Sequence, residues 1–199
     1  MYKNMRKFTF ALVATLLVVA CNAGQTVKKL PAPNKERTAT LMQALSDRQS
    51  IREYADTPIA LQDLSDLLWA ANGVNRPDGK RTAPSAVNRQ DIKVYVLDTE
   101  GSWLYDHTEH ALIKLNDGDF RQPIRDNMPP MNLVLVADAE WQWSGVDAGY
   151  VSQNIYLFCA ANGMATVAMG MFDEEAVSKA LNLLTEQQVV LVHPVGYKK

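Results

Sequence analysis

Apolar residues recur at intervals of three and four in several segments of the chain, the pattern of helices with one buried face. The predicted helices span residues 38–45, 58–72, 108–115, 146–162 and 174–183. The second has the clearest ends, because Pro58 suits its first turn and Gly73 suits its C-terminal cap. Asp173 should cap the last helix, with Glu174 and Glu175 favourably placed in its first turn.

Shorter runs rich in Val, Ile and Tyr indicate strands. The predicted strands span residues 93–97, 103–105, 131–137, 166–169 and 188–192, and the first two form a hairpin through a turn at 99–102. The run 131–137 is almost continuously apolar, so we expect a central strand covered on both faces. Helices and strands do not alternate regularly, and no glycine-rich turn joins a first strand to a helix. The pattern favours an α+β domain over a doubly wound nucleotide-binding fold.

The first twenty residues have the composition of an export signal. Three cations precede an apolar run, residues 8–20, that is too short to span a bilayer comfortably and ends at Ala20-Cys21. Small residues before a cysteine suit the peptidase that processes exported lipoproteins, and the pattern resembles a bacterial lipobox. An uncleaved anchor helix or a buried N-terminal helix is the alternative interpretation.

Lipidation of Cys21 would hold the mature protein to a membrane on its periplasmic or cell-surface side, through several acyl chains. Residues 1–20 are then a signal peptide, residues 21–36 a tether and residues 37–199 one folded domain. The tether is predicted from its polar composition and from the Pro31-Ala32-Pro33 break. Cys159 lies in an apolar pattern and is most simply a small core residue, so we expect no internal disulfide.

Charge and composition narrow the classes of function. The formal net charge is −2 and no basic stripe is present, so nucleic-acid binding has no electrostatic support. His107, His110 and His193 are scattered, and their spacing predicts no zinc site. The sequence also contains no Ser/His/Asp or Cys/His signature for nucleophilic catalysis.

Two polar clusters carry the candidate chemistry. In Arg48-Gln49-Ser50-Ile51-Arg52, two guanidiniums and a hydroxyl within five residues form a plausible clamp for an anion such as phosphate. The alternative is a solvated basic helix end. In residues 81–88, small residues around Pro84 let the backbone approach a flat ligand, to which Ser85 and Asn88 can donate. The alternative is an ordinary loop before the next strand.

Together, these clusters resemble the nitroreductase family of FMN-dependent oxidoreductases, in which an arginine cluster precedes a Pro-Ser-Ala-x-Asn motif. Further similar motifs follow the family's order: Leu67-Leu68-Trp69-Ala70-Ala71-Asn72-Gly73, Asp147-Ala148-Gly149, Gln153-Asn154, Ala160-Ala161-x-Gly163, Gly170 with Phe172-Asp173, and Val195-Gly196-Tyr197. The resemblance covers about residues 41–199. There are two departures. Val87 stands where the family often has glycine, and the chain stops at Lys199 where members commonly continue with a proline-containing tail.

The resemblance implies a central mixed or antiparallel sheet flanked by helices, in a domain-swapped type of homodimer with two FMN molecules at the interface. The residues implied to bind FMN are Arg48, Gln49, Ser50, Arg52, Pro84, Ser85, Ala86, Asn88, Thr166, Val167, Ala168, Gly170, Lys198 and Lys199. The arginine cluster and the two lysines would hold the phosphate and ribityl chain. The Pro84 cluster would reach the isoalloxazine ring from the other subunit, and the 166–170 stretch would pass near the ring's polar edge.

The implied activity is hydride transfer from NAD(P)H or another reductant, through FMN, to a nitroaromatic, a quinone or a similar small acceptor. No side chain is expected to be catalytic, since the flavin performs the redox chemistry. A non-catalytic surface lipoprotein that keeps the fold is one alternative, and a flavoenzyme that dehydrogenates a peptide-ring substrate is another. Export bears on the donor, because NADH and NADPH are made in the cytoplasm. A membrane quinol or an electron-carrier partner is the other expected source.

Overall fold

The structure is a computed structural model that describes residues 25–122 and 127–199. Its helices are α1 (Leu41–Asp47), α2 (Leu61–Asn72), α3 (Ser144–Ala161) and α4 (Glu174–Ala180), with a 3-10 turn at Ala86–Asn88. Its strands are β1 (Val27–Lys29), β2 (Lys93–Leu97), β3 (Gly101–Asp106), β4 (Ala111–Asp117), β5 (Met131–Asp138), β6 (Met164–Thr166) and β7 (Gln187–Tyr197). The predicted export signal and Cys21 lie outside the described residues.

The strands form one sheet in the order β1-β4-β3-β2-β5-β7-β6, and every neighbouring pair is antiparallel. β5 pairs with β2 on one side and β7 on the other, and residues 131–137 are all buried. The prediction of a central strand covered on both faces is therefore confirmed. Strands and helices are mixed without regular alternation, which confirms the α+β class.

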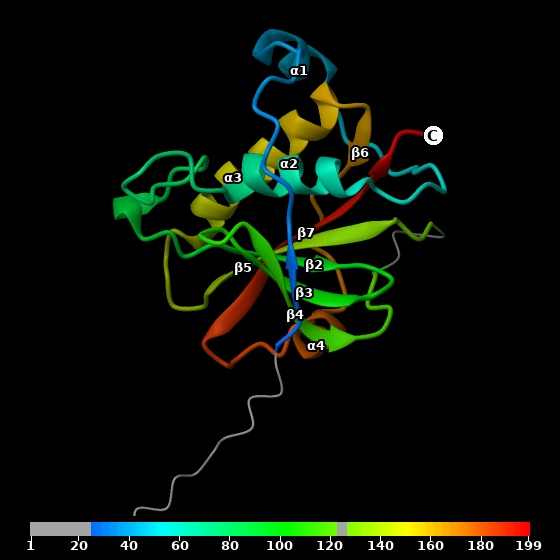
Figure 1. The fold of residues 1–199 in the computed structure, drawn as a ribbon. Coiled ribbons are helices and arrows are strands. Elements are labelled where there is room, and N and C mark those ends of the chain that lie inside the picture. The colour runs from blue at the N-terminus through cyan, green and yellow to red at the C-terminus, as the bar shows by residue number, and fades with distance from the viewer. Residues whose placement is uncertain (1–24, 123–126) are drawn as a thin grey trace, which may run out of the picture.

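Helices cover both faces of this sheet, and the cover is unequal (Figure 1). α2 and α3 pack on one face, where Leu67 and Leu68 of α2 and Ile155 of α3 join the larger apolar core. α4 lies on the other face, where Val177 packs in a smaller core against the opposite sides of β2, β5 and β7. Cys159 is buried in the larger core, and burial raises the pKa of its thiol, which keeps it protonated and unreactive.

The predicted helix ends at Asp173 and Gly73 agree with the structure, although Gly73 works by a different mechanism. The predicted start at Pro58 is wrong, because α2 begins at Leu61 after an N-cap at Ala60. Asp173 caps α4, and its carboxylate accepts a hydrogen bond from the Ala176 N–H at 2.9 Å. Gly73 ends α2, but its backbone is extended rather than left-handed. A Cβ at this position would lie 2.5 Å from the Trp69 Cδ1, so the glycine is required by close packing and not by its φ angle.

The helix predicted at 108–115 is wrong, because this segment is β4. Leu112 and Leu115 are three residues apart, which places them on one face of a helix but on opposite faces of a strand. Both faces of this sheet are covered, so Leu112 packs in the larger core and Leu115 in the smaller one. The Asp106 carboxylate accepts the Thr108 and Glu109 N–H groups, which fixes a turn where the helix was expected to begin.

Part of the segment predicted as a tether belongs to the folded domain. Val27–Lys29 pairs with β4 as an edge strand, and Leu30 is buried in the larger core. The Asn34 N–H donates to the buried Asp66 carboxylate at 2.7 Å. The packed domain therefore begins near Thr26 rather than at residue 37, because these polar-looking residues complete the outer edge of the sheet.

The last two predicted strands are displaced. The strand expected at 166–169 lies at Met164–Thr166, and the strand expected at 188–192 continues to Tyr197. Pro194 lies inside the longer strand, although proline cannot donate to a sheet. It falls between the Met169–Val192 bridge and the pairing of Val195 with Thr166, where that edge of β7 has no strand partner. The predicted strand is therefore shorter than β7, which has eleven residues and continues through Pro194.

Within the part of the chain that the structure describes, no helix is long and apolar enough to cross a membrane.

Candidate functional site

The arginine cluster follows α1 as an extended strip along the ends of β6 and β7. The Ile51 N–H donates to the Thr166 carbonyl at 2.9 Å. Three residues later, Tyr54 forms a bridge with Lys198. These backbone contacts leave the side chains of residues 48–50 and 52 exposed to solvent.

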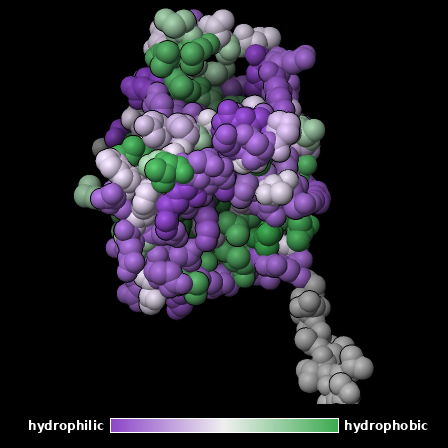
Figure 2. All heavy atoms as spheres, turned by 90° about the vertical axis from the view of Figure 1, so that its left-hand side faces the viewer, coloured by the Kyte–Doolittle hydropathy of each residue, from purple (hydrophilic) through white to green (hydrophobic). Residues whose placement is uncertain are grey.

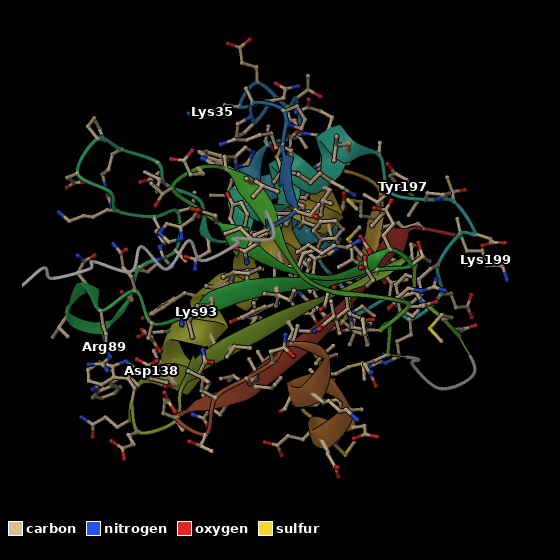
Figure 3. All side chains as sticks on the ribbon, turned by 60° about the horizontal axis from the view of Figure 1, so that its bottom comes forward. Lys35, Arg89, Lys93, Asp138, Tyr197 and Lys199 are labelled. Carbon is tan, nitrogen blue, oxygen red and sulfur yellow. The ribbon has the colours of Figure 1, made fainter. Side chains whose placement is uncertain are left out.

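Three of the four predicted site segments are therefore brought together, namely residues 48–52, 166–170 and 198–199. The Lys198 N–H donates to the Gly163 carbonyl at 3.0 Å, which holds the C-terminal lysines beside the strip. Figure 3 shows Tyr197 and Lys199 at this end of the molecule. Segments separated by more than a hundred residues in the sequence thus share one surface.

This surface carries cations that form no ion pair among the described residues. Among the ion pairs of the described residues, none involves Arg48, Arg52, Lys198 or Lys199. The Arg48 guanidinium instead lies over a tyrosine ring of α3, 5.4 Å from the ring centroid. Exposed cations that lack carboxylate partners are suited to a phosphate, because charge-assisted hydrogen bonds to its oxygens remain to be made.

The turn after β6 presents backbone rather than side chains. Thr166 and Val167 are both buried, and the Thr166 hydroxyl lies 3.2 Å from Nδ1 of His193. Ala168 is half-buried, and Gly170 is exposed with open space where a Cβ would be. Of the four residues predicted here, the first two can reach a ligand only through their backbone.

His193 lies beneath this turn, fully buried, with Nε2 2.9 Å from the Ser152 hydroxyl. Burial lowers the pKa of His193 to about 3, so its ring is neutral at any physiological pH. The sequence left its role open. The structure places it as an uncharged support between α3 and β6, away from solvent.

The fourth predicted segment, the Pro84 cluster, lies elsewhere. Its Ala86 N–H donates to the carboxylate of Asp147, in the first turn of α3, at 2.8 Å. Tyr156, which contacts the arginine strip, lies nine residues further along α3, about 13 Å at the rise of an α-helix. In Figure 3, Arg89, which directly follows this cluster, and Lys199 lie on opposite sides of the molecule. Within one chain the two halves of the predicted site do not meet.

The backbone of this loop is unusual. Val87, Asn88 and Gln90 have φ angles of 49°, 56° and 53°, in the left-handed region that a β-branched residue such as Val87 rarely adopts. The Val87 and Asn88 side chains are exposed, and the Ser85 hydroxyl accepts the Gln90 N–H at 2.8 Å. The loop therefore projects its tip outward from a tightly folded base.

Two buried carboxylates lie at that base, and one of them holds the loop by hydrogen bonds. Asp147 accepts the Ala86 N–H with one oxygen and the Trp141 indole N–H with the other, at 3.2 Å. Asp91 is buried beside it, and neither of its oxygens has a hydrogen-bond partner among the described residues. Burial and the neighbouring Asp147 raise the pKa of Asp91 to about 6. Sequence reasoning missed Asp91, since one aspartate in a polar stretch gives no sign of burial.

Comparison with known proteins places this geometry in a family. The model of the nitroreductase family matches residues 45–197, about three quarters of the chain. The chain belongs to the nitroreductase family. A predicted nitroreductase of Methanocaldococcus jannaschii is 28% identical over 182 residues, covering 79% of this chain and 91% of that protein.

Solved structures of family members have the same fold. The crystal structure of a predicted nitroreductase from Ralstonia eutropha is similar with a TM-score of 0.81 and 33% identity, covering 87% of this chain and 90% of that one. An FMN-dependent nitroreductase from Clostridium difficile is similar with a TM-score of 0.56 and 18% identity, covering 79% and 87% of the two chains. The expected nitroreductase-like fold is therefore confirmed, and family membership supports an oxidoreductase function.

Proposed function

We propose that this protein is an FMN-dependent oxidoreductase of the nitroreductase type, which passes a hydride from NAD(P)H or another reductant to a nitroaromatic, a quinone or a similar small acceptor. The observation that carries the proposal is the exposed surface on which Arg48, Arg52 and Lys198 gather beside the backbone turn 166–170, without carboxylate partners among the described residues. The cations of this surface suit a phosphate, and the backbone of the 166–170 turn suits the polar edge of a flat ring.

In this proposal, the protein binds and orients the cofactor, and the bound flavin supplies the redox chemistry. Arg48 and Arg52 hold the phosphate by charge-assisted hydrogen bonds, with Lys198 and Lys199 adding positive charge beside them. Ser50 donates to the ribityl chain. The 166–170 backbone would border the ring of the bound flavin.

A homodimer completes the proposed site, because the Pro84 cluster is too far from the arginine strip to act within the same chain. Apolar side chains are exposed on the outer faces of two helices, namely Leu41, Met42 and Leu45 of α1 and Val146 and Tyr150 of α3. Figure 2 shows apolar atoms gathered at the top of the molecule, where Figure 1 places α1. Burial of these faces against a second copy would bring its ring-contacting loop to this site.

The absorbance spectrum of the purified protein tests the proposal most directly. Bound FMN should absorb near ~450 nm, as protein-bound flavins do, and anaerobic NADH or NADPH should bleach that band. Turnover of an added nitroaromatic or quinone would then support the proposed acceptor class. A flavin that binds but resists both nicotinamides, and is reduced by a quinol, would assign a different donor. A colourless protein that takes up no added FMN would exclude the proposal in favour of a non-catalytic lipoprotein.

We further propose that Cys21 carries a lipid anchor that places this enzyme on an extracytoplasmic membrane surface, because its sequence surroundings resemble a lipobox. Metabolic labelling with a fatty acid should mark the wild-type protein and not Cys21→Ala. Labelling of both proteins, or of neither, would contradict the anchor. The variant should still bind FMN, since the site lies entirely within the folded domain.

A further inference from the structure

The hydroxyl of Tyr156 connects two of the segments that form the candidate site. It accepts a hydrogen bond from the Ala168 N–H at 2.8 Å and lies 3.0 Å from the Ser50 hydroxyl. A phenol has one hydrogen to donate, and its oxygen can accept as well as donate. One hydroxyl therefore satisfies a backbone donor of the 166–170 turn and a side chain of the arginine strip together.

The ring that carries this hydroxyl is held in place on two sides. The Arg48 guanidinium lies over the ring, 5.4 Å from its centroid. The ring packs edge-to-face with the buried His193 imidazole at a centroid separation of 5.5 Å and an interplanar angle of 78°. His193 is itself hydrogen-bonded from both nitrogens, to Ser152 of α3 and Thr166 of β6. The tyrosine therefore links the buried core to the exposed strip by ring packing and hydrogen bonds.

Another contact of the described residues joins the strip to the 166–170 turn but does not orient the Ser50 side chain. The strip and the turn are also joined by the backbone bond from Ile51 to Thr166. That bond fixes the relative position of the two backbone segments but does not hold the Ser50 side chain. The Ala168 N–H donates to the tyrosine hydroxyl and would lose this acceptor without it. Both groups therefore depend on the same oxygen for their orientation.

We propose that Tyr156 is a positioning residue of the flavin site, whose hydroxyl fixes Ser50 and the Ala168 N–H relative to each other. The inference rests on the proposed function and deepens it. Ser50 contacts the ribityl chain in that proposal, and the Ala168 turn borders the ring. Removal of the hydroxyl should therefore weaken FMN binding and also change the midpoint potential of the bound flavin.

Tyr156→Phe tests this directly, because it keeps the ring between Arg48 and His193 and removes only the oxygen. We expect the Kd for FMN, measured by quenching of flavin fluorescence, to rise about tenfold, since one hydrogen bond is lost and a backbone donor is left unsatisfied. The matched control is Tyr95→Phe, which removes the hydroxyl of a tyrosine of β2 in the smaller core on the other face of the sheet and should leave the Kd unchanged. An unchanged Kd and potential in Tyr156→Phe would overturn the inference.

A second variant separates positioning from a general loss of stability. Ser50→Ala removes the same contact from the side of the exposed strip, where a substitution should change the stability of the fold little. If the tyrosine acts partly through Ser50, the double variant should weaken FMN binding by clearly less than the product of the two single effects. Independent, fully multiplicative effects would overturn that part of the role. A structural role alone would lower the melting temperature of Tyr156→Phe without moving the potential of bound FMN.

The hydrogen bond itself can be measured without flavin. Amide exchange at Ala168, followed by NMR in the protein before FMN is added, should be faster in Tyr156→Phe than in the wild type. Equal exchange would contradict the positioning contact. If the wild type binds no FMN at all, the proposed function fails, and the exchange measurement still decides whether the tyrosine orders this turn.

Discussion

The two halves of the candidate site, at opposite ends of α3, differ in how the fold holds them. The arginine strip is attached to the sheet by backbone hydrogen bonds, through Ile51 to β6 and through Ala55 to β7. The Pro84 loop is attached to α3 mainly through the carboxylate of Asp147. The first half exposes unmatched positive charge, whereas the second buries negative charge and places non-glycine residues in left-handed conformations.

This difference indicates that the halves have different tasks. A strip fixed to the sheet can present its cations in one arrangement, which suits tight binding of a phosphate. A loop that stores backbone strain and rests on a buried acid is sensitive to its surroundings, and such strain persists only where the rest of the fold compensates for it. The affinity for FMN should therefore depend most on the arginine strip, whereas the effects of pH should arise mostly at the Pro84 loop.

Arg52→Ala should have the largest effect on FMN binding. If this guanidinium makes a charge-assisted contact with the phosphate, its loss should weaken FMN binding by about 2–4 kcal/mol. Fluorescence titration with FMN gives the affinity, and Arg76→Ala is the control, since Arg76 is an exposed arginine in the polar turn before β2. Equal affinities for FMN in the wild type and Arg52→Ala would remove Arg52 from the site.

Asp91→Asn should be the next largest change, and it should increase stability. The pKa of Asp91 is about 6 in the folded protein, above its ordinary value of 3.8. Its contribution to stability is therefore complete below pH 3.8 and is lost as the pH rises through 6. At pH 7 the asparagine variant should be more stable by about 2 kcal/mol, because no charge is buried beside Asp147.

The pH dependence of the difference between the two proteins isolates this group. Urea unfolding at a series of pH values should show the advantage of Asp91→Asn shrinking as the pH falls from 6 towards 4. Asp56→Asn, a change at an exposed carboxylate, serves as the control and should show no such trend. An advantage that stays constant with pH would mean that the buried charge is not its cause.

Val87→Gly should give the smallest of these effects, again as a gain. A β-branched residue with φ of 49° is strained, and glycine relieves that strain at some cost in the entropy of the unfolded chain. The net gain in the free energy of unfolding should be about 1 kcal/mol. Val146→Gly, in the first turn of α3, should instead lower stability, because glycine disfavours helices. A loss of stability in both variants would contradict the strain at Val87.

Much of the fold could be predicted from sequence because its pattern is local. The apolar run of β5 is buried along almost its whole length, and α2 and α3 bury the faces that their spacing indicates. β4 was mistaken for a helix because a sheet covered on both faces removes the alternation that marks a strand. β1 was mistaken for a tether because an edge strand of three residues has too few apolar positions to be recognised.

The candidate site shows the same division between local and distant information. Arg48, Ser50 and Arg52 lie within five residues of each other, so their grouping is visible in the sequence alone. Tyr156 lies more than a hundred residues from Ser50, and Asp91 lies more than fifty residues from Asp147, so neither belongs to a recognisable pattern. Their roles depend on which distant groups the fold brings to the tyrosine hydroxyl and to the buried carboxylate.

The sequence by itself determined the family, the α+β class, the central strand and the residue types that a phosphate-bearing flavin would need. Only the tertiary structure decided that three of the four predicted segments share one surface and that the Pro84 loop lies away from it. The physical reason is that side-chain periodicity and local motifs act over a few residues. The meeting of β6, β7 and the arginine strip is set by hydrogen bonds between residues more than a hundred positions apart.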